Sequence, residues 1–469
     1  MIKYAWNGYK KYAWGANEVR PILKQAHNQD IFGGSKSDRN MAATIIDAID
    51  TLWIMNLTKE YYEARDFIKN EFNIKNVTSY ISIFETNIRF LGGMLATYAL
   101  TKDELFKSKA IEIGEVLISA FKLPLGIPKS LLNPQTVGRI VFFFILNLSS
   151  HFLIGEAINY DWAYRKSSIL AEIGSFALEF NYLSYLTKNP IYQQKVRGIL
   201  HHLNRAKKID GLYPNYISAE TGKWAFMHSS LGALGDSFYE YLIKGYIQSN
   251  DLLSWTMYLE AIKAIEKKMI LRSKEGMVYI GEWKNGVIER KMSHLACFCI
   301  GMFALQAKLD NSVRKERLQR LAEELGHTCH ESYIKSATGL GPEMFHFKPG
   351  REAMTTNSVE YAYLLRPEVI EGWFYLWRLT GKSIYKEWIW NAILAIEKYC
   401  KKEAGYAGLK NVYNINDGWD DAQQSFFLAE TLKYAYLAFS NNSIVSLNKW
   451  VFNTEGHPLP ILKILPKNL

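Results

Sequence analysis

The sequence contains little cysteine and little proline, with four cysteines and 12 prolines among its 469 residues. Four cysteines are too few for a scaffold built on disulfides, and their spacing lacks the close pairs that typify a zinc site. From their number alone, the cysteines are best interpreted as reduced residues of the core. The composition therefore does not determine whether the protein works in an oxidising or a reducing compartment. The four are Cys297, Cys299, Cys329 and Cys400.

A long uninterrupted apolar run is also missing. The longest apolar stretch, residues 140–154, is short for a membrane span and contains Asn, Ser and His. The residues that follow Met1 have no apolar core of signal-peptide length. If the protein is luminal, we expect its targeting segment and any N-terminal membrane anchor to lie outside this sequence; a cytosolic protein is the alternative that these residues leave open.

No long basic run is present either, although Lys and Arg outnumber Asp and Glu and give a formal net charge of +10. The basic residues are scattered along helical stretches, as on a solvated surface. We therefore predict no nucleic-acid partner.

The chain is rich in apolar residues (48%) and aromatic residues (14%), enough for a large core. Most of them recur at helical spacing, and strand-like alternation is confined to short pieces such as residues 276–283. Seven times an apolar, aromatic-rich helix is usually followed by a polar break and a more charged helix. Neither end resembles the polar cap of an open solenoid. We therefore predict an all-α ring of inner helices wrapped by outer ones, with residues 1–469 forming a single domain.

Most of the predicted inner helices carry an acidic or imidazole residue close to their start. These residues are Asp47, Glu85, Glu172, Asp236, His294, Glu368 and Glu430. Any one carboxylate alone is explained by stabilisation of a helix N-terminus. Six in the same phase are better explained by convergence on one cavity. Crowded carboxylates repel one another, so some should have the raised pKa that a general acid needs.

Eight ordered motifs carry a family resemblance from about Tyr4 to Pro460. They are FETNIRFLGG, LGDSFYEYLIKGY, HLACF, TCHESY, TGLGPE, LRPEVIE, QSFFLAETLKY and FNTEGHPLP. In these motifs the chain resembles glycoside hydrolase family 47, the class I α1,2-mannosidases. The resemblance implies an (α/α)7 barrel of seven helical hairpins. It also implies calcium-dependent, inverting removal of α1,2-linked mannose from high-mannose N-glycans of glycoproteins.

Roles follow from the motifs residue by residue. The resemblance implies that Glu368 is the general base, that Glu85 or Asp236 is the acid, and that Glu343 is a further catalytic carboxylate. It implies that Thr454 binds Ca²⁺ through its hydroxyl and carbonyl oxygens. The implied substrate residues are Arg89, Glu172, His294, Arg366, Phe426, Glu430 and Glu455.

Without the motifs, several of these residues have ordinary interpretations. Arg89, one helical turn after Glu85, would form an ion pair. His294 and Phe426 would be packed in the core, and Thr454 would cap a helix or a turn.

The resemblance also implies a disulfide between Cys297 and Cys329, which argues for an oxidising lumen and reverses the default drawn from cysteine number. Leu234, two residues before Asp236, matches the Golgi-type enzymes, whereas the endoplasmic reticulum type carries arginine there. We therefore expect a luminal monomer, in the Golgi rather than the endoplasmic reticulum.

One segment departs from the family pattern. An atypical insert at about 140–158 is rich in Phe, Ile and Leu and has no helix caps, as in translated noncoding sequence or a membrane-touching loop. After it, Tyr164-Arg165-Lys166 replaces small residues. Two hypotheses follow: a competent mannosidase, or a non-catalytic, lectin-like glycan-binding protein acting in glycoprotein quality control. The intact acidic set favours the first.

Overall fold

The computed structural model describes residues 1–32, 41–122, 124–136 and 157–462. The atypical insert predicted at about 140–158 therefore lies outside the described residues, except for its last two, Ala157–Ile158, which form strand β5.

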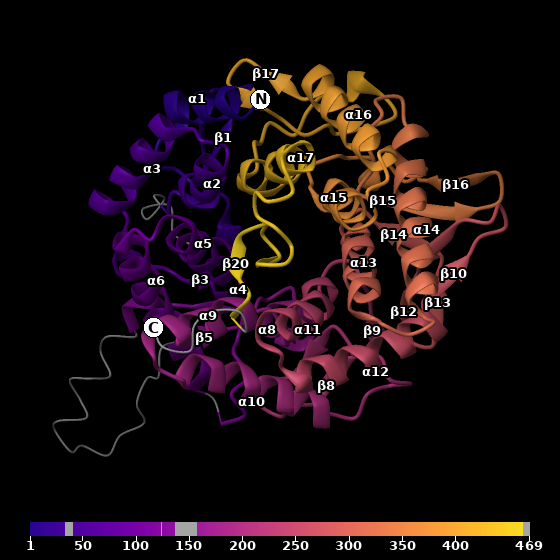
Figure 1. Ribbon diagram of the computed structural model, residues 1–469, viewed down its shortest axis with the longest axis horizontal. Coiled ribbons are helices and arrows are strands. Elements are labelled where there is room, and N and C mark those ends of the chain that lie inside the picture. The colour runs from indigo at the N-terminus through magenta and orange to yellow at the C-terminus, as the bar shows by residue number, and fades with distance from the viewer. Residues whose placement is uncertain (33–40, 123, 137–156, 463–469) are drawn as a thin grey trace.

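The described helices form two concentric layers (Figure 1). The inner helices are α2 (Ala43–Ile54), α5 (Gly92–Thr101), α9 (Ala177–Thr187), α11 (Asp236–Ser249), α13 (Cys299–Leu309), α15 (Glu368–Thr380) and α17 (Leu432–Phe439). The outer helices are α1 (Ile2–Ala13), α3 (Thr58–Asn70), α6 (Glu104–Leu117), α10 (Ile191–Arg205), α12 (Leu252–Lys268), α14 (Lys315–Ile334) and α16 (Ile384–Tyr399). Two shorter helices, α4 (Ile83–Glu85) and α8 (Leu170–Gly174), precede α5 and α9.

The inner helices contact one another in chain order from α2 to α17. The π-helical turn η10 (Phe427–Thr431), which leads into α17, contacts α2 and closes the ring. The fold is an (α/α)7 barrel, as the sequence predicts.

The two layers differ in their sequence pattern. In α13 nine residues, 299–307, are consecutively buried, whereas α14 buries Leu318, Leu321, Ala322 and Leu325 at helical spacing and exposes polar residues between them. Small residues let the inner helices approach closely. A Cβ added at Gly301 of α13 would lie 2.5 Å from the ring of Tyr375 on α15.

The strands are short and belong to two- and three-stranded antiparallel sheets. The predicted strand-like piece at 276–283 contains β11 and part of β12, which agrees with the expectation. Besides β5, the strands before the last hairpin are β1 (Glu18–Arg20), β2 (Gln25–His27), β3 (Ile81–Ser82), β4 (Leu131–Leu132), β6 (Ser168–Ile169), β7 (Tyr216–Ile217), β8 (Trp224–Phe226), β9 (His228–Ser229), β10 (Ile270–Arg272), β11 (Val278–Ile280), β12 (Glu282–Lys284), β13 (Val287–Glu289), β14 (Lys291–Ser293), β15 (Met344–Lys348), β16 (Arg351–Met354), β17 (Lys401–Lys402) and β18 (Gly405–Tyr406).

A final hairpin fills the middle of the barrel. Strands β19 (Trp450–Phe452) and β20 (Pro458–Pro460) pair in antiparallel register, and the yellow ribbon of this segment lies inside the ring (Figure 1). The hairpin contacts α5, α9 and α11. Its turn, residues 453–457, is therefore presented to the interior of the barrel.

Within the described ranges, no helix combines the length and the apolar character needed to cross a membrane.

A disulfide joins Cys297, in the 3₁₀ turn η7 (Leu295–Phe298), to Cys329 on α14. The two Cα atoms lie 6.3 Å apart, within the range that a disulfide spans. Cys299 and Cys400 are buried and free. The pairing agrees with the one that the family resemblance implies.

We expect the double variant Cys297→Ala/Cys329→Ala to lose about 4 kcal/mol of unfolding free energy, because the bond closes a loop with a sequence separation of 32. Urea-induced unfolding measures this loss. The matched control is Cys299→Ala, which removes a buried sulfur but keeps the cross-link, and its loss should be about 1 kcal/mol. Equal losses in the two variants would contradict the stabilising role of the bond.

Candidate active site

A cavity of about 740 Å³ opens at the end of the barrel where the inner helices begin. Helices α11 and α15 start with Asp236 and Glu368, both of which line it. Ten of the twelve predicted catalytic, substrate and metal residues line this cavity. They are Glu85, Arg89, Glu172, Asp236, Arg366, Glu368, Phe426, Glu430, Thr454 and Glu455.

The two other predicted residues, Glu343 and His294, are not part of this lining but contact Arg366 and Glu368, which are. His294 is buried, whereas Glu343 is partly exposed. Asp47, which the periodicity also directed to the cavity, lies beneath it with no exposed surface. The starts of the inner helices therefore do converge. Their polar side chains form two layers, one that lines the cavity and one that is buried beneath the lining.

The lining is strongly acidic. Eight carboxyl groups and two guanidinium groups face the cavity, counted over the described residues. The acidic residues are Glu85, Glu172, Asp236, Glu240, Glu368, Glu371, Glu430 and Glu455. In a partly dehydrated site this imbalance disfavours full ionisation, so some of these groups hold protons or face a cation.

Arg89 organises one side of the cavity. Its Nε donates to Glu85 at 2.6 Å, and its Nη1 contacts Asp47 at 3.1 Å and also Glu455. Burial acts to lower the pKa of Arg89, but these carboxylates outweigh it and hold the pKa well above its usual value. The guanidinium also lies 5.8 Å from the ring centroid of Phe426. Arg89 sits in the π-helical turn η3 (Thr86–Leu91), a helix type that is frequent at functional sites.

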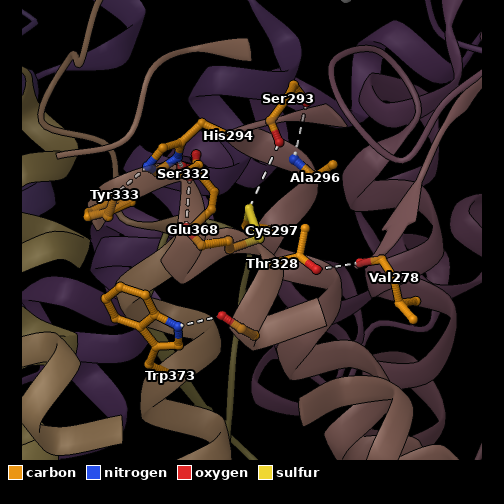
Figure 2. The surroundings of a disulfide bond; sticks show 12 residues. Val278, Ser293, His294, Ala296, Cys297, Thr328, Ser332, Tyr333, Glu368 and Trp373 are labelled. Atoms are coloured by element: carbon orange, nitrogen blue, oxygen red, sulfur yellow. Dashed lines mark hydrogen bonds and ion pairs between the residues drawn. A yellow bond between two sulfur atoms is a disulfide. The ribbon is translucent and has the colours of Figure 1, made fainter. Parts of the chain in front are cut away.

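Glu368 is held by a histidine on the other side. Nδ1 of His294 donates to Glu368 at 2.8 Å, and its Nε2 lies 2.7 Å from the Tyr333 hydroxyl (Figure 2). Burial acts to raise the pKa of Glu368, but the hydrogen bond from His294 and the charge of Arg366 outweigh it. The net effect lowers the pKa, so Glu368 is a carboxylate at neutral pH.

Glu343 contacts this wall through Arg366. Nε of Arg366 donates to both carboxylate oxygens of Glu343, at 2.7 and 2.9 Å. The backbone N–H of His294 donates to the Glu343 carbonyl at 2.9 Å. Glu343 thus orients Arg366 and the segment of His294, and it does not itself line the cavity.

Asp236 and Glu172 have the opposite electrostatic character to Glu368. Burial raises the pKa of Asp236 to about 7, and the nearby charges of Glu240 and Glu368 add to this effect. Burial likewise raises the pKa of Glu172 to about 8. Among the described residues, Glu172 Oε2 is buried without a hydrogen-bond partner. Both groups can therefore hold a proton near neutral pH.

Sequence reasoning missed Glu240 and Glu371, which also line the cavity. Lys244, on α11, pairs with Glu240 and lies 3.8 Å from Glu371. Burial raises the pKa of Glu371 to about 8, even though Lys244 acts to lower it. The signal was available, because Glu240 follows Asp236 by one helical turn and Glu371 follows Glu368 by three residues.

Thr454 lies in the turn between β19 and β20 and lines the cavity. Among the described residues, neither its hydroxyl nor its carbonyl oxygen takes part in a hydrogen bond. Glu430 and Glu455 also line the cavity. Burial and neighbouring carboxylates hold the pKa of each well above its usual value; the foremost neighbouring carboxylate is Glu455 for Glu430 and Asp47 for Glu455. No group of three or more His, Cys, Asp or Glu residues in the described ranges forms a metal site of its own.

Known proteins resemble this chain over most of its length. The sequence profile of glycosyl hydrolase family 47 matches residues 1–461. Mannosyl-oligosaccharide 1,2-alpha-mannosidase mans-2 of Caenorhabditis elegans is 53% identical over 98% of this chain and 75% of its own length. Mannosyl-oligosaccharide 1,2-alpha-mannosidase IB of Homo sapiens is 47% identical over 99% of this chain and 69% of its own length.

A solved structure agrees with the sequence comparison. The alpha-1,2-mannosidase from Trichoderma reesei has 26% sequence identity and a TM-score of 0.84, over 98% of this chain and 97% of that one. The whole-length profile match, the two long relatives and this shared barrel lead to one conclusion. The chain belongs to glycosyl hydrolase family 47.

Proposed function

We propose that this glycoside hydrolase is a competent, inverting α1,2-mannosidase that trims high-mannose N-glycans of glycoproteins. The observation that carries the proposal is the contrast between two cavity carboxyl groups. The pKa of Glu368 is lowered and that of Asp236 is raised to about 7. One carboxylate and one carboxylic acid at the same pH are what general-base and general-acid catalysis need. A lectin needs no such pair, and no observation favours the non-catalytic alternative.

In this mechanism Glu368 takes a proton from water, which attacks the sugar carbon from the face opposite the leaving oxygen. Direct attack by water inverts the configuration and releases β-mannose. His294 keeps Glu368 ionised and oriented through the 2.8 Å hydrogen bond.

The proton for the leaving oxygen comes from a second carboxyl group, for which Asp236 and Glu85 are the candidates. Glu85 accepts the Nε–H of Arg89 at 2.6 Å, so its carboxyl group is already engaged by a guanidinium. No ion pair joins Asp236 to a cation among the described residues, and burial raises its pKa to about 7. These surroundings favour Asp236.

The remaining cavity residues are proposed to bind the sugar. Arg89 and Arg366 offer guanidinium donors, while Glu172, Glu430 and Glu455 offer carboxyl groups to mannose hydroxyls. Phe426 provides an aromatic face.

Calcium fits the donors present at Thr454. The hydroxyl and carbonyl oxygens of Thr454 have no other hydrogen-bond partner among the described residues, and the surrounding carboxyl groups supply an excess of negative charge. An all-oxygen, high-coordination site that includes water suits Ca²⁺. When bound, the ion would hold hydroxyls of the departing mannose and favour ring distortion.

We also propose a luminal location, in the Golgi rather than the endoplasmic reticulum, and a monomeric, single-domain enzyme. The Cys297–Cys329 disulfide supports an oxidising compartment. Leu234, which lines the cavity, supports the Golgi type.

Replacing Glu368 by Gln should lower kcat by about 10² to 10⁴ and leave KM almost unchanged, because Gln keeps the shape but takes no proton from water. Mannose release from a high-mannose oligosaccharide measures both constants. Proton NMR of early product by the parental enzyme should show β-mannose. Early α-mannose, or parental turnover by the Gln variant, would exclude this role for Glu368.

The pH profile of kcat/KM should be bell-shaped. Activity falls at low pH as Glu368 gains a proton, below the ordinary pKa of Glu because its pKa is lowered. It falls at high pH as Asp236 loses its proton, with a midpoint at about pH 7. The residual activity of Asp236→Asn should lack the alkaline limb. If that limb persists in Asp236→Asn and disappears in Glu85→Gln, the acid is Glu85.

Chelation should abolish turnover, and added Ca²⁺ should restore it. Calorimetry should detect Ca²⁺ binding to the parental protein and at least tenfold weaker binding to Thr454→Val, which loses a ligand oxygen. Thr431→Val serves as a control, because that buried hydroxyl donates to the Leu365 carbonyl and does not line the cavity. Full activity of demonstrably calcium-free protein would refute the requirement.

A further inference from the structure

We propose that Trp162 forms a sugar-binding subsite at the mouth of the cavity. There, a mannose ring of the same oligosaccharide, beyond the mannose that is cleaved, stacks on the indole. The subsite would make Trp162 a determinant of affinity for long glycans. This inference rests on the proposed function, because it concerns a second part of the same substrate.

The position of Trp162 is the first observation. The residue lines the same cavity as Glu85 and Glu172, yet 61% of it is exposed. A single exposed aromatic residue is common on protein surfaces and by itself needs no explanation. Here the exposed indole borders the opening through which the sugar chain must leave the cavity. An aromatic face at that place suits the apolar C–H face of a sugar ring.

The indole is also fixed in orientation. Its ring stacks on Tyr160, with centroids 5.0 Å apart and an interplanar angle of 19°. Tyr160 itself lines the cavity, as does Glu172. One ring is therefore anchored to the cavity wall, and the second lies on it. A pre-ordered ring loses little conformational entropy when a ligand binds.

Hydrogen bonds fix the base of the loop that carries Trp162. The side chain of buried Asn159 accepts from the Ser130 N–H at 2.9 Å and donates to the Lys166 carbonyl at 2.8 Å. Lys166 also pairs with Asp161 at 2.7 Å. These contacts close residues 159–166 into a compact turn that holds the exposed ring without burying it.

The backbone of this turn is strained at its end. Arg165 and Lys166 both have φ 51°, in the left-handed region that side chains other than Gly, Asn and Asp rarely adopt. Such conformations persist where surrounding contacts enforce them, and they cluster at ligand-binding sites. Tyr164 precedes them, stacks on Phe226 with centroids 4.9 Å apart and is 38% exposed, so it extends the aromatic surface of the loop.

The test compares a short substrate with a long one. For Trp162→Ala, we expect KM for a high-mannose oligosaccharide to rise about tenfold with kcat unchanged, because stacking is lost in substrate and transition state alike. The KM for α1,2-linked mannobiose should stay within twofold, since a disaccharide is too short to reach the mouth. Trp162→Phe should restore most of the affinity.

The matched control is Trp390→Ala. Trp390 lies on the outer helix α16, is 51% exposed and does not line the cavity. Its replacement should change neither KM. An unchanged oligosaccharide KM in Trp162→Ala would overturn the proposal. An equal rise for both substrates would also overturn it, because that result indicates a displaced loop.

Failure of the proposed function gives a different result. In that case the parental protein would release mannose from neither substrate. Calorimetry with an oligosaccharide already stripped of its α1,2-linked mannoses then decides the subsite. About tenfold weaker binding to Trp162→Ala than to the parental protein would support the subsite, and equal binding would exclude it.

Discussion

The buried guanidinium of Arg89 joins distant parts of the chain. It contacts Asp47 on α2, Glu85 at the end of α4 and Glu455 in the turn of the last hairpin. Loss of one partner from such a buried cluster leaves unpaired charge and typically costs about 3 to 5 kcal/mol. The first inner helix and the final hairpin are thus held together by the same group that borders the sugar cavity. The seating of the last hairpin inside the barrel and the shape of the active site therefore share one interaction.

The acidity of the cavity follows from the same architecture. Inner helices that start at one end of a ring bring their first-turn carboxyl groups together, and helix dipoles favour negative charge there. Repulsion and burial then act unequally on the individual groups. A hydrogen bond from His294 acts to keep Glu368 ionised, whereas burial and the charges of Glu240 and Glu368 raise the pKa of Asp236, which holds its proton. The closed barrel thereby generates different acid strengths from chemically similar side chains.

Sequence reasoning recovered the barrel because helical periodicity and the seven-fold recurrence are local patterns. It also placed Asp236 and Glu368 at helix starts, where position within one turn determines direction. It did not find Glu240 and Glu371, one turn deeper, although their helical spacing from Asp236 and Glu368 places them on the same helix faces.

The sequence also did not predict which of these residues face the cavity. Motifs alone gave no means to separate residues that line the cavity, such as Arg366, from those that only contact the lining, such as Glu343 and His294. That distinction arises from tertiary packing of β14, β15 and η7, which no local pattern encodes.

The disulfide lies close to the residues that hold Glu368 (Figure 2). Cys297 follows His294 by three residues, and Cys329 precedes Tyr333 by one turn of α14. The covalent bond and the His294–Tyr333 hydrogen bond therefore join the same two segments. In addition to stabilising the fold, the disulfide would restrain His294 and Tyr333, which back the proposed base. A chain that folded with reduced cysteines would keep its barrel but lose the rigid backing of that base, so full catalytic power would develop only after the chain enters an oxidising environment.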